Sequence, residues 1–189
     1  MVSQNSNTKR GSLTFAQVEL SNTFRRLWIE HVLWTRFFLV STTFDLPELP
    51  FVTERLLQNP HDFANELRPF YGNQVATTFD NLFTEHLLIA AALVNAAKAG
   101  NTEEAEKQRA LWYDNASKIA AFLASINPVW SENVWKDLLF THLDMTENEA
   151  VALLTGQYDE SIKIYDKIQE EALKMADFMT YGLIRQFGI

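Results

Sequence analysis

The chain has 189 residues, of which 47% are hydrophobic and 21% charged, the balance of a soluble globular protein with a sizeable core. Acidic residues outnumber basic ones by 24 to 16, and the net charge of -8 argues against nucleic acid or an anionic membrane as partner, because both attract basic surfaces. The absence of cysteine excludes disulfides, thiolate metal sites and cysteine nucleophiles.

The first segment, "MVSQNSNTKRGS" at 1–12, is polar, and we predict that it is disordered. The stretch that follows is interrupted by Gln17 and Glu19, unlike the apolar core of a signal peptide. The longest apolar stretch, which begins at Leu87, is too short to span a bilayer. We therefore predict a soluble, cytoplasmic protein with one folded domain at 13–189.

Helical periodicity dominates the remaining chain, and it predicts four long helices. Gly72 precedes the second of them, and "GN" at 100–101 followed by "TEEAE" indicates a stop and an acid-rich restart. So short a connection makes the helices on either side of it antiparallel neighbours. The predicted helices cover about 13–43, 73–99, 102–126 and 159–187.

The two longer connections each predict a pair of short helices. In the first connection, Pro60 and Pro69 mark the breaks. In the second, Thr146 and Glu149 have the spacing of a capping box at the start of a short helix. The fold class predicted is therefore all-α, an up-down, ferritin-like four-helix bundle with short capping helices.

An internal repeat is indicated by matches at one offset. The pair "LW" at 27–28 recurs at 111–112, and "FL" at 38–39 recurs at 122–123. This predicts two pseudo-symmetric halves, with His31 of one half near Asn115 of the other. The halves cover about 27–98 and 111–182.

Each long helix carries a polar residue near the middle of its apolar side. A buried imidazole or carboxylate is costly unless it is paired or bound to a metal, and metal sites in bundle cores are built from such inward side chains. Periodicity leaves open whether residue 85 or 86 faces the core, and likewise residue 170 or 171. The candidate metal ligands are His31, Glu85, His86, Asn115 and Glu171.

Two imidazoles with one or two carboxylates suit a single Fe, Mn or Zn ion, with Asn115 as a weak ligand or a hydrogen-bond donor. No Glu-x-x-His motif occurs, which argues against a ferritin-type di-iron site. The alternative is that these residues only satisfy one another, His31 with Glu171 and His86 with Glu85. Glu30 is explained by an ion pair with Arg26 on the flank of the helix.

Two functions follow from these alternatives. The first is a metal-dependent binding or redox protein with an open coordination position for a small ligand. The second is a non-catalytic interaction or small-ligand-binding module whose core polar residues are structural. The chain has no nucleotide-binding or hydrolase motif, so no residue is assigned a catalytic role. A homo-oligomer is compatible with either function. The two remaining histidines, His61 and His142, are predicted to be surface or capping residues.

Five segments carry a family resemblance. They are "LWIEHVLWTR", "RPFYG", "TEHLLIAAALVNAAKAG", "WYDNASKIAAFLASINP" and "YDKIQEEALKMAD", within about 24–187. The chain resembles a family of small all-helical bacterial proteins, mainly from Firmicutes, and is similar to ferritin-like four-helix proteins of unknown function that hold a metal between helices. That resemblance implies a metal site with His31, Glu85, His86 and Glu171 as candidates.

Overall fold

The computed structural model describes residues 13–189, which form helices without any strand in that range. The all-α prediction is therefore confirmed, whereas the prediction of disorder at 1–12 lies outside the described residues. The five helices are α1 (Phe15–Thr43), α2 (Leu49–Lys98), α3 (Thr102–Ile126), α4 (Glu132–Leu154) and α5 (Tyr158–Phe187). Among them, none contains a stretch long and apolar enough to cross a membrane.

The four long helices predicted from periodicity correspond to α1, the second part of α2, α3 and α5. The predicted pairs of short helices were wrong, because each connection forms one continuous helix instead. Residues 49–71 form a first arm of α2 that runs through Pro60 and Pro69, and α4 runs without a break through Thr146. The chain leaves helical geometry inside α2 only at Gly72, where φ is 79° and ψ is 176°.

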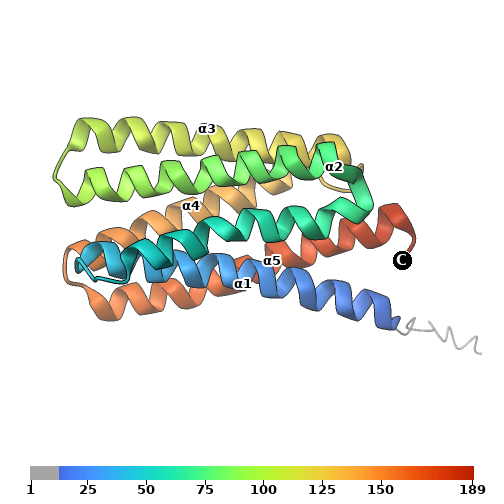
Figure 1. The fold of residues 1–189 in the computed structure, drawn as a ribbon, viewed down its shortest axis with the longest axis horizontal. Coiled ribbons are helices and arrows are strands. Elements are labelled where there is room, and N and C mark those ends of the chain that lie inside the picture. The colour runs from blue at the N-terminus through green and yellow to red at the C-terminus, as the bar shows by residue number, and fades with distance from the viewer. Residues whose placement is uncertain (1–12) are drawn as a thin grey trace, which may run out of the picture.

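The helical segments run up and down alongside one another (Figure 1). The two arms of α2 are antiparallel and meet at Gly72, so residues 13–189 contain six helical segments that run parallel or antiparallel to one another. Each helix contacts the next one along the chain, and α5 returns to contact α1. The segments therefore form a closed circuit around a common core.

Buried positions recur through this circuit at intervals of about 56 residues. On the first segment of each pair, leucines at 27, 82 and 138 are each followed four residues later by a buried histidine. On the second segment, the recurring buried positions are 59, 115 and 171, then 64, 120 and 176. The core therefore repeats as three helical hairpins: α1 with the first arm of α2, the second arm with α3, and α4 with α5. The predicted twofold offset is not the one that these positions follow.

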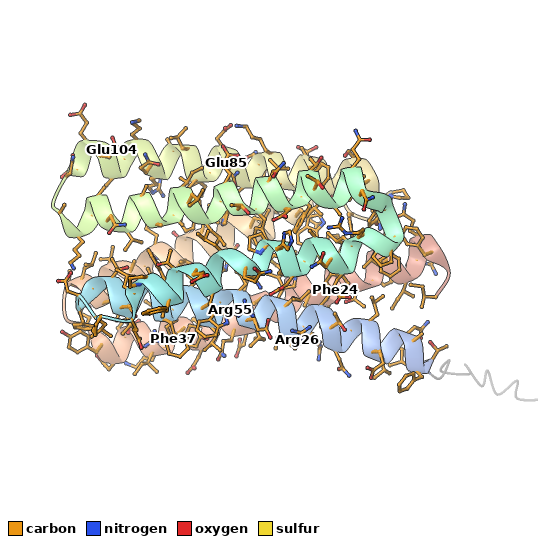
Figure 2. All side chains as sticks on the ribbon, in the orientation of Figure 1. Phe24, Arg26, Phe37, Arg55, Glu85 and Glu104 are labelled. Carbon is orange, nitrogen blue, oxygen red and sulfur yellow. The ribbon has the colours of Figure 1, made fainter. Side chains whose placement is uncertain are left out.

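Aromatic side chains join the three hairpins at the centre. The Trp28 ring centroid lies 5.1 Å from that of Phe63, 5.9 Å from that of Phe83 and 6.4 Å from that of Trp135. Phe24, labelled in Figure 2, lies in the same cluster, with its ring centroid 6.3 Å from that of Phe63. One continuous core therefore holds all three hairpins.

Candidate functional site

Three buried histidines lie on the inward faces of α1, the second arm of α2 and α4. They are His31, His86 and His142. The ring centroids of His31 and His142 are 5.5 Å apart, while the ring of Phe83 stacks on His31 at 4.8 Å and lies 6.0 Å from that of His86. The three histidines and Phe83 therefore lie next to one another in the core.

The first histidine is held by an asparagine of the facing helix. The Asn59 side-chain nitrogen donates to the backbone oxygen of Leu27 at 3.1 Å, so its amide oxygen faces His31, with 3.2 Å between that oxygen and Nδ1. Because an amide oxygen only accepts, Nδ1 of His31 carries the proton and Nε2 keeps its lone pair. Burial lowers the pKa of His31 well below its ordinary 6.5, aided by His142 and His86, so the ring is neutral.

The second hairpin repeats this arrangement. Asn115 donates to the backbone oxygen of Leu82 at 3.1 Å, and its amide oxygen lies 3.0 Å from Nδ1 of His86. The indole nitrogen of Trp112 also donates to Nε2 of His86 at 3.1 Å, so both ring nitrogens are engaged. Burial, with a smaller contribution from His142, lowers the pKa of His86 to about 3.

The third hairpin departs from the pattern, because a glutamate occupies the asparagine position. Nδ1 of His142 and Oε2 of Glu171 are 3.6 Å apart, too far for a hydrogen bond. Within residues 13–189, neither oxygen of Glu171 nor Nδ1 of His142 has a hydrogen-bond partner, although both side chains are buried. A carboxylate, unlike an amide, also has no hydrogen to donate to the carbonyl of Leu138.

Four of the five predicted metal ligands, His31, His86, Asn115 and Glu171, are buried. Glu85, labelled in Figure 2, is exposed, and one of its oxygens accepts a hydrogen bond from Asn115 of α3 at 3.0 Å. Periodicity left open whether residue 85 or 86 faces the core, and the structure shows that it is His86.

Of residues 170 and 171, Glu171 is the one that faces the core, because Glu170 is exposed. The predicted residues pair within hairpins instead of closing around one point: His86 with Asn115, and Glu171 with His142. In residues 13–189, no three histidine, aspartate or glutamate side chains are grouped to hold a metal ion as they stand.

His142 and Asn59 were missed as site residues. His142 was expected at the surface of a short helix, and it is instead buried in the middle of α4. Leu-x-x-x-His also precedes the exposed His61, at 57–61, so the pattern alone does not identify His142. The signal is its recurrence at intervals of 55 and 56 residues, at 27–31, 82–86 and 138–142, together with the partners at 59, 115 and 171. The prediction for His61 was right, since its exposed ring pairs with Asp80 at 2.7 Å.

A second buried carboxylate, that of Glu149, lies on α4 seven residues after His142. Glu149 was expected to cap a short helix, and it is instead buried and paired with Arg36 of α1. Burial raises the pKa of Glu149 to about 7, and the attraction of Arg36 only partly opposes this. The guanidinium of Arg36 also lies over the ring of Tyr165, 5.0 Å from its centroid.

Comparison of the chain with protein-family models, with curated proteins and with solved structures finds no match. The resemblance to a helical bacterial family therefore stays a prediction, and the functional argument rests on the residues described above.

Proposed function

We propose that the protein binds one divalent transition-metal ion between His142 and Glu171. The observation that carries this proposal is the departure of the third hairpin from its two sister hairpins. In the sister hairpins an asparagine amide accepts a hydrogen bond from the histidine, whereas this hairpin has a buried carboxylate whose oxygens find no hydrogen-bond partner within residues 13–189. A buried carboxylate without a hydrogen bond is costly, and a bound cation removes that cost.

The separation of the two side chains supports the same ligand. Two atoms that each lie about 2.1 Å from a metal, at an angle of about 110–120°, are about 3.4–3.6 Å apart. Nδ1 of His142 and Oε2 of Glu171 are 3.6 Å apart. The distance is too long for direct hydrogen bonding and suits two ligands of one ion.

His31 is the third ligand in this proposal. Its Nδ1 is engaged by Asn59, which leaves the lone pair of Nε2 for a metal, and its ring centroid is 5.5 Å from that of His142. Metal binding has to draw this ring closer, because the side chains do not form a three-ligand group as they stand. Two imidazoles and one carboxylate suit Fe(II), Mn(II) or Zn(II) and leave positions for water or a small ligand.

The alternative is a non-catalytic interaction or ligand-binding module in which the pair is only structural. The repeat suggests a substitution that distinguishes metal binding from a purely structural role. Glu171→Asn gives the third hairpin the residue that its sisters carry, so the variant is expected to fold and to lose the metal. Glu170→Asn, at the exposed neighbouring position, is the matched control and is expected to keep it.

Elemental analysis and Co(II) or Zn(II) titration of protein purified without chelator or nickel column measure these outcomes. We expect one equivalent in the wild type and in Glu170→Asn, and loss of binding in Glu171→Asn and His142→Ala. Less than a tenth of an equivalent in the wild type, with no uptake at neutral pH, would contradict the proposal. Full retention in Glu171→Asn would contradict the ligand assignment.

A further inference from the structure

A cavity of about 130 Å³ lies between both arms of α2, the start of α3, the last part of α1 and the end of α4. The cavity opens to solvent where its lining residues are exposed, at Ala97 of α2, Thr102 and Glu106 of α3, and Val151 of α4. The cavity is separate from the His142–Glu171 pair, since neither residue lines it.

The walls of the cavity are almost entirely apolar, and aliphatic and aromatic side chains such as Phe38, Leu93 and Val94 form most of them. Arg109 and Glu147 also line the cavity and are paired with each other at 2.9 Å. An apolar cavity of about 150 Å³ in another protein accepts a benzene molecule. The size and lining therefore suit an uncharged ligand of about one aromatic ring.

Two threonine hydroxyls in the lining favour a ligand that carries a hydrogen-bond donor. Thr35 and Thr146 line the cavity one helical turn beyond His31 and His142, and each hydroxyl donates its hydrogen to the backbone oxygen of that histidine at 2.8 Å. The indole N–H of Trp112, which also lines the cavity, is donated to His86. The hydroxyls have only lone pairs left, so they can accept a hydrogen bond from a ligand but cannot donate one.

We propose that this cavity binds a small uncharged molecule, about one aromatic ring in size, that carries a hydrogen-bond donor. Phenol is the simplest probe of that class. The proposal does not depend on the metal site, so phenol binding should be unchanged by a chelator.

Calorimetric titration with phenol at millimolar concentrations tests the site, with Ala105→Leu as the variant that fills it. Ala105 lines the cavity from α3, whereas Ala110 is exposed on the same helix and is the matched control. We expect binding at least about tenfold weaker in Ala105→Leu, because the added side chain occupies the ligand volume, and unchanged binding in Ala110→Leu. No binding to the wild type, or equal binding to Ala105→Leu, would overturn the proposal.

The donor preference has its own test in the double variant Thr35→Val/Thr146→Val. Toluene has the shape of phenol without the O–H group, so the ratio of the two affinities isolates the hydrogen bond. We expect this ratio, phenol over toluene, to fall about fivefold in the variant, as for loss of one net hydrogen bond. Retained toluene binding shows that the variant cavity is intact, and an unchanged ratio would overturn the role of the threonines.

Discussion

Asn59 and Asn115 show how one amide side chain can hold a buried histidine. Each uses its nitrogen to bond a backbone carbonyl and its oxygen to bond Nδ1 of the ring, which fixes the position and the tautomer of that ring. The same position in the third hairpin holds Glu171, which cannot donate as a carboxylate. Of the three equivalent positions, two thus hold an amide and one a carboxylate, and that difference marks the candidate site.

Asn115→Ala tests the structural role of this amide. The variant leaves the Nδ1–H group of His86 buried without an acceptor, so we expect unfolding free energy to fall by about 1–3 kcal/mol. Urea denaturation followed by tryptophan fluorescence measures it. Asn148→Ala, which removes an exposed amide from α4, should change the value by less than about 0.5 kcal/mol. Equal effects in the two variants would contradict the role assigned to Asn115.

The pH dependence of stability follows from the buried ionisable groups. The pKa values of His31 and His86 lie below the ordinary 6.5, so the unfolded chain binds more protons and stability falls as pH drops below 6.5. The pKa of Glu149 is raised from 4.5 to about 7, so this group adds stability as pH drops across that range. On acidification, the two histidines therefore lower the stability of the fold while Glu149 raises it.

Between pH 6.5 and 4.5 we therefore expect a net loss of stability as the pH falls, with each group contributing at most about 1.4 kcal/mol per pH unit. Urea denaturation at half-unit pH intervals gives the slope. In Glu149→Gln the opposing group is gone, so the loss of stability per pH unit should become steeper. A stability that rises on acidification over this range would show that the histidines are not buried as neutral rings.

The helices differ in how far the sequence determines them. The predicted long helices came from apolar periodicity with clear ends, and the structure places all four within two residues of their predicted bounds. The sequence predicts two short helices in place of the first arm of α2, because a proline inside a helix removes a hydrogen bond and costs about 3 kcal/mol. Pro60 is nevertheless buried next to Asn59, whose bonds to α1 hold this part of the helix in place. Such tertiary contacts cannot be read from local propensity.

Two glycines of different helices should respond differently to alanine. At Gly72, φ is 79° and ψ is 176°, a conformation that only glycine adopts readily, and nothing lies within 4 Å of an added Cβ, so Gly72→Ala should cost about 2 kcal/mol through backbone strain alone. At Gly182, the added Cβ would meet Nε1 of Trp130 at 1.8 Å, so α5 or the indole must move. We expect Gly182→Ala to cost more, about 3 kcal/mol. Thermal unfolding by circular dichroism ranks them, and the reverse order would contradict this account.

The organisation of the whole molecule was the hardest part to predict. The twofold offset rested on pairs of aromatic and aliphatic residues, which recur in any amphipathic helix. The threefold period has few identical residues, because the histidine is the only polar residue common to its first helices and the partners are Asn, Asn and Glu. His142 was also assigned to a short helix, which hid its equivalence to His31 and His86. The buried candidates were predictable from periodicity, but their partners depend on which helices meet.

A core shared by three hairpins makes unfolding cooperative. The aromatic cluster joins Trp28 of the first hairpin, Phe83 of the second and Trp135 of the third, so no hairpin keeps its apolar face buried when another leaves. We therefore expect one urea transition in which tryptophan fluorescence and the helical circular dichroism signal share a midpoint. A helix signal that outlasts the fluorescence change would show that a hairpin is stable without its neighbours.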